Sequence, residues 1–213
     1  MSSVKLSGID ISYHNGEIDF SKIASKLDFI IMRSGYGKKT TDSKEIKFDT
    51  YYSEAKKHKI PIGTYWYSYA TTPEEALLEA KAFLNKVKGK QFEFPVYYDV
   101  EEKNTFNTGK ENVNNIIKAF FEELEKNGYY CGLYCSANIL NSVISDEIKN
   151  NYEIWVANWS VEKPYYKGKW GIWQYSSKGH FDGIQSEYVD LDTAIIDYEP
   201  IIKQLGKNGY LKQ

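Results

Sequence analysis

The sequence predicts an α/β fold in which eight strands close into a single barrel. Strand-like and helix-like segments alternate five times between residues 6 and 150, which is typical of parallel βα units. Three further strand-like segments follow, joined by loops too short for crossover helices. A doubly wound open sheet would need helices throughout, so short antiparallel strands that close a barrel fit the pattern better.

We expect one domain over residues 1–213, with its core at about 6–205, because a chain of 213 residues can bury one large core. The predicted strands are apolar or aromatic runs bounded by glycine, proline or polar residues. They cover 6–11, 28–33, 60–66, 94–102, 129–134, 153–157, 169–175 and 188–191. The predicted helices cover 18–25, 44–58, 72–87, 113–124, 138–150 and 198–205.

Two of these helices carry clear boundary signals. Thr72 suits an N-cap, Pro73 suits the first helical position, and Glu75 completes a capping box. In the other helix, apolar residues recur at helical spacing over 113–124, before an Asn-Gly pair that ends the run. Each helix lies between two predicted strands, as a crossover helix does in a parallel βα unit.

The fourth predicted strand ends in three carboxylates, Asp99, Glu101 and Glu102. Side chains two apart on a strand point to the same face, so Asp99 and Glu101 would share a face with Cα atoms roughly 7 Å apart. Such a pair suits a hydrolase in which one carboxyl donates a proton while the other stays ionised. The alternative is a strand end that passes into a polar loop, because an Asp-x-Glu pattern is a weak motif by itself.

Chemistry in β/α barrels gathers at the carboxyl ends of the strands, and the residues predicted there form a ring of acids with aromatic walls. This arrangement is typical of a saccharide cleft, although about half of the aromatic rings are expected to belong to the core instead. Arg33 is the only arginine in the chain, and we interpret it either as a site residue or as part of a surface ion pair. The candidate substrate-binding residues are Arg33, Tyr65, Tyr67, Trp155, Asn158, Trp159, Gln174 and Tyr175.

Composition narrows the classes of function. A net charge of -2 favours neither nucleic acid nor a membrane surface, and no obligate protein partner is evident. Three scattered histidines lack metal-ligand spacing, so neither a metal nor another cofactor is predicted. On one strand, Cys131 and Cys135 would lie roughly 13 Å apart, too far for a disulfide. No signal-peptide pattern opens the chain, so we expect synthesis in the cytoplasm and action after release.

Four groups of motifs give the chain a family resemblance over nearly its whole length. They are GIDIS at 8–12, IMRSGYG at 31–37, YYDVE at 97–101, and WVA at 155–157 with WQYS at 173–176 and VD at 189–190. In this order and spacing they resemble glycoside hydrolase family 25, the Chalaropsis-type lysozymes of phage endolysins and bacterial autolysins. The resemblance implies a TIM-barrel-like, flattened (β/α)5(β)3 barrel and N-acetylmuramidase activity on bacterial cell-wall peptidoglycan.

The resemblance also implies roles for four carboxyls: Glu101 as general acid, Asp99 as its catalytic partner, and Asp10 and Asp190 as supporting acids in the same cleft. A structural role for Asp10 and Asp190 stays open, because strand-end acids also accept backbone N–H bonds or pair with Arg33. The chain departs from the family pattern at positions of the cleft wall, which bears on substrate side-group preference. These positions are His14 and Asn15, Trp159, and Asp192, where an aromatic-Gln pair, Tyr and Asn are expected.

The expected reaction is hydrolysis of the β-1,4 bond between N-acetylmuramic acid and N-acetylglucosamine with retention of configuration. Glu101 would protonate the leaving oxygen, with a pKa raised by burial and by ionised Asp99. Either Asp99 attacks the anomeric carbon, or the substrate's acetamido oxygen does so while Asp99 orients that group. Carboxyls on the same side of the bond favour the second route. A saccharide-binding barrel without turnover and a metal-dependent hydrolase are the competing interpretations.

Overall fold

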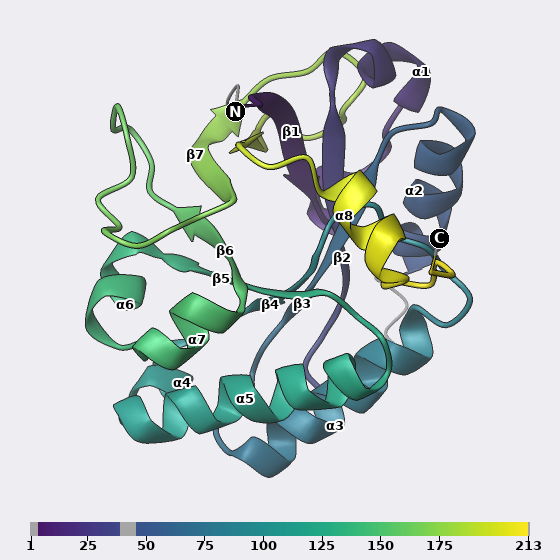
Figure 1. Ribbon diagram of the computed structural model, residues 1–213. Coiled ribbons are helices and arrows are strands. Elements are labelled where there is room, and N and C mark those ends of the chain that lie inside the picture. Colours follow the sequence, from purple (N-terminus) through teal and green to yellow (C-terminus); the bar gives the residue numbers. More distant parts are fainter. Residues whose placement is uncertain (1–3, 39–45, 213) are drawn as a thin grey trace.

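Eight strands form one closed barrel in chain order in the computed structural model, which describes residues 4–38 and 46–212 (Figure 1). Strands β1 to β7 run parallel, and β8 runs antiparallel to both β7 and β1. This architecture confirms the predicted α/β barrel. The strands are β1 (Leu6–Ile11), β2 (Phe29–Tyr36), β3 (Ile62–Tyr67), β4 (Val96–Asp99), β5 (Cys131–Ser136), β6 (Glu153–Ala157), β7 (Ile172–Gly179) and β8 (Val189–Ala194).

Of the described strands, only β8 is antiparallel to its neighbours. The prediction of short antiparallel closing strands is therefore wrong for β6 and β7, which pair in parallel. The chain returns between them through residues 158–171 without a helix. Asn158 holds this loop, because its side chain accepts the Tyr165 N–H and its carbonyl accepts the Trp173 indole N–H, both at 2.8 Å. The carboxyl ends of β1 to β7 consequently open toward the same end of the barrel.

Helices cover the outside of the barrel, and α3 lies beside α5 (Figure 1). The predicted 72–87 helix is confirmed as α3, with the Thr72 hydroxyl accepting the Glu75 N–H at 3.3 Å. The predicted 138–150 helix is two short ones, α6 and α7, each with a serine N-cap, and α4 has no predicted counterpart. The helices are η1 (Tyr13–Asn15), α1 (Phe20–Ile23), η2 (Ala24–Lys26), α2 (Ile46–Lys57), α3 (Pro73–Lys86), α4 (Lys103–Phe106), α5 (Lys110–Lys126), α6 (Ala137–Ser142), α7 (Asp146–Asn151) and α8 (Tyr198–Leu205).

The predicted helix of 44–58 corresponds to α2. Its first two positions, 44 and 45, lie outside the described residues. Within 4–38 and 46–212, no helix is both long and apolar enough to cross a membrane.

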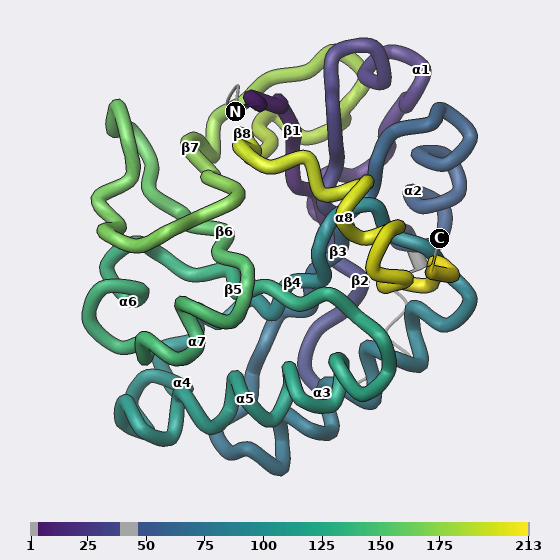
Figure 2. The backbone as a smooth tube through the Cα atoms, viewed as in Figure 1, coloured from purple at the N-terminus to yellow at the C-terminus, as the bar shows by residue number. Residues whose placement is uncertain are grey.

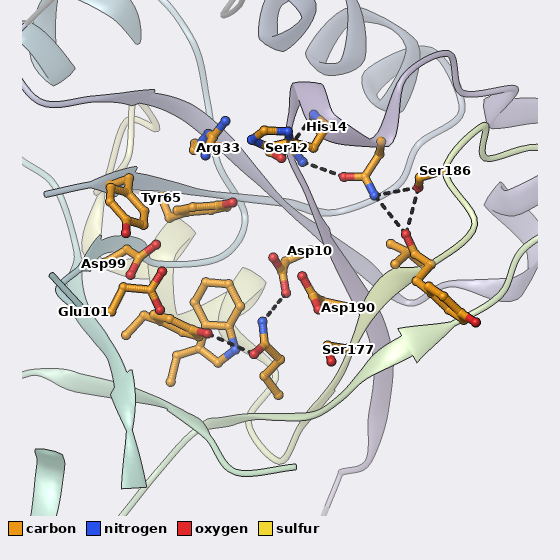
Figure 3. A pocket seen from close by; sticks show the side chains of 17 residues that line it. Asp10, Ser12, His14, Arg33, Tyr65, Asp99, Glu101, Ser177, Ser186 and Asp190 are labelled. Atoms are coloured by element: carbon orange, nitrogen blue, oxygen red, sulfur yellow. Dashed lines mark hydrogen bonds between the residues drawn. The ribbon is translucent and has the colours of Figure 1, made fainter. Parts of the chain in front are cut away.

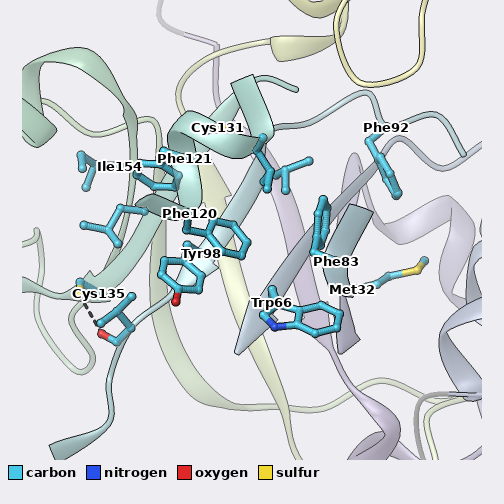
Figure 4. Packing of buried hydrophobic residues seen from close by; sticks show 14 of the residues in the cluster. Met32, Trp66, Phe83, Phe92, Tyr98, Phe120, Phe121, Cys131, Cys135 and Ile154 are labelled. Atoms are coloured by element: carbon cyan, nitrogen blue, oxygen red, sulfur yellow. Dashed lines mark hydrogen bonds between the residues drawn. The ribbon is translucent and has the colours of Figure 1, made fainter. Parts of the chain in front are cut away.

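The outward faces of the strands pack against the helices in the larger of two apolar clusters (Figure 4). On β4, the outward residue Tyr98 stacks on Phe120 of α5 with ring centroids 3.8 Å apart. The Tyr98 hydroxyl donates at 2.6 Å to Glu79 of α3, a buried carboxyl. Because successive strand residues face opposite sides, anchoring Tyr98 outward turns Tyr97 and Asp99 toward the barrel interior.

A second, mainly aromatic cluster fills the barrel interior and includes residues of α8, the helix drawn in yellow in Figure 2. Tyr198 and Ile202 of α8 are fully buried there. Glu153, the first residue of β6, accepts the hydroxyl protons of Tyr130 at 2.8 Å and Tyr198 at 2.7 Å. The amino ends of the parallel strands are thus closed, which leaves the carboxyl ends as the open end. The inward apolar residues are Phe29, Ile31, Tyr65, Phe94, Tyr97, Tyr134, Trp155, Ile172 and Ala194.

The closeness of the interior packing is testable at Gly8 of β1. A Cβ at this position would lie 2.4–2.6 Å from ring carbons of Phe29. We expect Gly8→Ala to lower the free energy of unfolding by about 1–3 kcal/mol, because the buried ring must shift. Urea unfolding measures this. The matched control is Ser7→Ala at the exposed neighbouring residue, with an effect within about 0.5 kcal/mol. Equal effects of the two changes would contradict the packing described.

Candidate active site

A cavity of about 360 Å³ opens at the carboxyl ends of the parallel strands (Figure 3). Each of the eight strands contributes at least one side chain to its wall. Figure 3 shows Asp99 beside Glu101 and Asp10 beside Asp190, so the acids form two neighbouring pairs. The lining residues are Asp10, Ser12, His14, Asn15, Arg33, Tyr65, Tyr67, Asp99, Glu101, Tyr134, Trp155, Gln174, Ser177, Ser186, Tyr188, Val189 and Asp190.

Asp99 and Glu101 face the cavity together, but for a reason other than the one predicted. Asp99 is the last residue of β4, and Glu101 lies beyond the strand, so strand alternation does not place it. Backbone contacts with both neighbouring strands shape the turn. The Ser68 N–H donates to the Asp99 carbonyl at 2.9 Å, and the Val100 N–H donates to the Tyr134 carbonyl at 3.3 Å. Tertiary contacts therefore position Glu101.

The two carboxyls occupy unequal environments. Asp99 is only 4% exposed, and burial, reinforced by the charge of Glu101, raises its pKa well above the ordinary range. Glu101 is exposed at the cavity, yet the surrounding walls remove part of its solvent and raise its pKa, and the charge of Glu102 adds to this. Burial raises the pKa of Glu101 as expected, but the charge that adds to this effect is that of Glu102 and not that of Asp99. Asp99 is the more buried of the pair.

Arg33 supplies the positive charge of the cavity wall. Strand β2 continues past it to Tyr36, with a register shift between Arg33 and Gly35. The guanidinium carbon lies 4.9 Å from the ring centroid of Tyr13 and 5.6 Å from that of Tyr36, within cation–π range. Its charge lowers the pKa of Asp99 and also that of Glu101, opposing the effect of burial. The sequence predicts Arg33 either as a site residue or as part of a surface ion pair. The structure places its side chain in the cavity wall, which agrees with the first interpretation.

Gln174 connects the acids to the aromatic wall. Its Nε2 donates to Asp10 Oδ2 at 2.7 Å, and its Oε1 accepts the Tyr134 hydroxyl and the Trp159 indole N–H, both at 2.9 Å. These two donors fix the amide so that its N–H points at Asp10. Asp190 lies directly opposite Asp10 in the β1–β8 register, so both carboxyls reach the cavity from adjacent strands.

A further carboxyl, Asp192, lies outside the cavity lining and is 1% exposed. Its Oδ1 accepts the Trp155 indole N–H at 2.8 Å. Burial raises the pKa of Asp192 to about 8 and the pKa of Asp190 to about 6. Burial also raises the pKa of Asp10 well above the ordinary range, and the charges of Asp192 and Asp190 add to this effect. The sequence marks Asp192 both as an alternative to Asp190 among the acids at the strand ends and as a departure from the family pattern, and its two-residue spacing from Asp190 indicates the same inward face.

Three predicted substrate-binding residues do not line the cavity. Tyr175 alternates with Gln174 on β7 and points to the other face, and Asn158 orders the loop that follows β6. Trp159 is 49% exposed and reaches the site only through its bond to Gln174. The remaining predicted site residues do line the cavity: Asp10, Arg33, Tyr65, Tyr67, Asp99, Glu101, Trp155, Gln174 and Asp190.

Two loops that meet across the barrel mouth contribute several of the lining residues. The Asn15 amide donates to the Ser186 hydroxyl at 3.0 Å and to the Tyr188 carbonyl at 3.4 Å. The Gln185 side chain accepts the Glu17 N–H at 2.7 Å. The partners are about 170 positions apart in sequence, so no local pattern joins them. His14 and Asn15 line the cavity, as the resemblance implied. The lining residues without a predicted role are Ser12, Tyr134, Ser177, Ser186, Tyr188 and Val189.

Comparison with known proteins identifies the family. Residues 9–184, most of the chain, match the family described as Glycosyl hydrolases family 25. The chain belongs to this family. The autolytic lysozyme of Clostridium acetobutylicum is 27% identical over 188 residues, which cover 88% of this chain and 55% of that protein. The chain therefore spans about half the length of this relative.

Solved structures share the fold. The crystal structure of the CTP1L endolysin matches with a TM-score of 0.81 at 25% identity, covering 93% of this chain and 69% of that one. The modular autolysin LytC of Streptococcus pneumoniae, solved in complex with a synthetic peptidoglycan ligand, matches with a TM-score of 0.75 at 29% identity. That match covers 89% of this chain and 46% of LytC. These findings confirm the predicted flattened barrel, and the family to which the chain belongs is one of glycoside hydrolases.

The raised pKa values of the buried acids predict how stability depends on pH. An acid whose pKa is raised by folding stabilises the native state below its unfolded pKa, and this contribution is lost as pH rises through the folded pKa. For Asp190 and Asp192 the loss extends from about pH 4 to folded values of about 6 and 8. We expect the free energy of unfolding to fall by more than about 2 kcal/mol between about pH 5 and pH 9, since one pKa unit corresponds to about 1.4 kcal/mol. Urea titrations at constant ionic strength measure this, and a stability maximum near pH 9 would contradict it.

Proposed function

We propose that this family 25 chain hydrolyses the β-1,4 bond between N-acetylmuramic acid and N-acetylglucosamine in bacterial peptidoglycan. The observation that carries the proposal is the pair Asp99 and Glu101 in a cavity walled by further acids and tyrosines. The names of the relatives, an autolytic lysozyme, an endolysin and an autolysin with a peptidoglycan ligand, support the same substrate. Because this substrate lies outside the cytoplasm, the proposal includes action on the wall after release.

In this proposal Glu101 is the general acid. It is exposed at the cavity, so the leaving oxygen of a bound glycan can reach it. Its raised pKa increases the protonated fraction available to donate at mildly acidic pH. The adjacent Glu102 lies outside the lining and accepts the Tyr67 hydroxyl at 2.7 Å, which leaves Glu101 as the carboxyl that faces the substrate.

Asp99 is the partner of the acid and sits deeper in the barrel. We assign it to the acetamido group of the sugar, whose oxygen attacks the anomeric carbon as the glycosidic bond breaks. This attack closes a five-membered, positively charged oxazolinium ring. The N–H of the acetamido group donates to Asp99, and both this hydrogen bond and the positive charge of the new ring favour the ionised form of the Asp99 carboxyl. Arg33 acts in the same direction. Glu101, now ionised, then takes a proton from the water that opens the ring, so the configuration is retained.

Asp10 and Asp190 are supporting acids in this scheme. Their carboxyls face the cavity beside the catalytic pair, and the bond from Gln174 fixes the orientation of Asp10. Asp10 is not placed to replace Glu101 as the acid, because it is 6% exposed and already engaged by Gln174. Their negative charge favours the positive charge that develops on the sugar ring.

Substitution of the acid tests the reaction directly. We expect Glu101→Gln to lower the rate of peptidoglycan hydrolysis by about 10²–10⁴-fold, because the amide cannot donate the proton. Purified peptidoglycan is digested, the new reducing ends are reduced with borohydride, and the reduced sugar is identified by mass spectrometry. Glu111→Gln, an exposed carboxyl at the start of α5, is the matched control and should keep the native rate.

The identity of the reduced sugar separates the alternatives. Reduced muramic acid from the native chain and the control, with almost none from Glu101→Gln, supports a muramidase. Reduced glucosamine would instead make the chain a glucosaminidase. Binding to peptidoglycan without any new reducing end would overturn the catalytic proposal and leave a saccharide-binding barrel. Loss of activity with a chelator would point to a metal-dependent hydrolase.

The stereochemistry is a separate prediction. Attack by the acetamido oxygen followed by attack of water inverts the anomeric carbon twice, so the first-formed product keeps the β configuration. Proton NMR of a chitooligosaccharide or muropeptide digest, recorded before mutarotation, reads the anomer directly. A first-formed α anomer would exclude both the acetamido route and a covalent Asp99 intermediate.

A further inference from the structure

Asp10 and Asp192 form a buried carboxyl pair at the base of the cavity wall. In the antiparallel β1–β8 register, Asp10 lies opposite Asp190 and Gly8 lies opposite Asp192, so all four residues face the interior. Asp10 and Asp192 are diagonal neighbours on adjacent strands, so their buried carboxyls are close enough to interact, and the charge of Asp192 raises the pKa of Asp10.

Each of these carboxyls receives one neutral N–H donor. The Trp155 indole donates to Asp192 Oδ1 at 2.8 Å, and the Gln174 amide donates to Asp10 Oδ2 at 2.7 Å. Asp192 Oδ2 is buried and receives no hydrogen bond from any described residue. Neither aspartate forms an ion pair with a lysine or arginine of the described chain. Two buried carboxylates in this setting would lack compensation for the loss of solvent.

We propose that Asp10 and Asp192 hold one proton between them, and that Asp192 is thereby a positioning residue that fixes Asp10 at the cavity wall. A hydrogen bond between two carboxyl groups requires one proton, and it satisfies the Asp192 oxygen that has no other donor. The inference rests on the proposed function for the role of Asp10, but the shared proton itself does not depend on it.

The groups around the pair favour retention of this proton. The charge of Asp190, on β8, acts on both carboxyls of the pair. Four tyrosines also interact electrostatically with the pair: Tyr65 of β3 and Tyr134 of β5 with Asp10, and Tyr97 of β4 and Tyr175 of β7 with Asp192. A charge on Asp190 disfavours a second charge on the pair, and the tyrosines are neutral at physiological pH. Burial raises the pKa of Asp192 to about 8, so the proton is retained at neutral pH and lost at alkaline pH. Its loss leaves two facing carboxylates beside Asp190 and removes the hydrogen bond by which Asp192 helps to position Asp10.

Asp192→Asn is the decisive variant. Asparagine has the same shape, its Oδ1 can accept the Trp155 indole N–H, and its amide N–H can donate to Asp10 at any pH. Asp182→Asn is the matched control, because the Asp182 side chain is 85% exposed. Asp192→Ala removes both the donor and the acceptor.

Unfolding in urea at several pH values tests the shared proton without reference to activity. Between about pH 6 and pH 9, the unfolding constant of the native chain and of Asp182→Asn should rise at least tenfold more than that of Asp192→Asn, because only the aspartate loses a proton in the folded state. Parallel pH dependences of the native chain and Asp192→Asn would overturn the shared proton.

Hydrolysis of peptidoglycan tests the positioning role. At about pH 6, Asp192→Asn should keep kcat within about threefold while Asp192→Ala loses about tenfold or more with a smaller change in KM. At about pH 9, kcat/KM normalised to pH 6 should be about tenfold higher for Asp192→Asn than for the native chain, since one ionisation is removed. Equal losses in both variants, or an unchanged alkaline limb, would overturn the positioning role. If neither the native chain nor any variant hydrolyses peptidoglycan, the proposed function fails. The unfolding measurement then still shows whether Asp10 and Asp192 share a proton.

Discussion

The burial of acid groups at the open end of the barrel is the constraint on which the site depends. Asp10, Asp99 and Asp192 are almost inaccessible to solvent, and an ionised carboxyl loses much of its hydration there. The barrel offsets this cost only in part, through the N–H groups of Gln174 and Trp155 and the charge of Arg33 on Asp99. These acids therefore keep their protons to higher pH than they would in water.

The division of the interior into two halves makes this burial possible. Aromatic side chains fill the half next to α8, and Glu153 with its two tyrosine donors closes that end. Water is thereby excluded below the acids, while the cavity above them admits the substrate. The outer cluster between strands and helices supplies most of the apolar burial, and it anchors Tyr98 so that Asp99 has only the inward direction left. The chemistry rests on a rigid scaffold, whereas the polar wall formed by the loops is open to variation.

Much of this architecture could be predicted because the signals are local. The capping residues of α3, the apolar periodicity of α5 and the strand runs each act within a few residues, where backbone geometry and side-chain direction are set by neighbours. The direction of the strand that follows a loop could not be predicted in this way. Nothing in residues 158–171 shows that the chain returns to the start of a parallel strand, because the loop is also held from outside by Asn141 of α6, which bonds the backbone of Tyr165 and Lys167. Tyr175 illustrates a related limit, since the sequence shows the alternation with Gln174 but not which face is inward.

The sequence by itself determined the βα order, the strand that ends in Asp99, the solitary arginine and the motifs that place the chain in its family, because each depends on residue type and short spacing. The tertiary structure alone decided which carboxyls share a solvent-poor space, and hence their protonation. Asp192 shows why: its neighbour Asp10 is more than 180 positions away in the chain, and only the β1–β8 register brings the two together. Desolvation and charge coupling act over a few ångströms in space, and the closing of the barrel sets those distances.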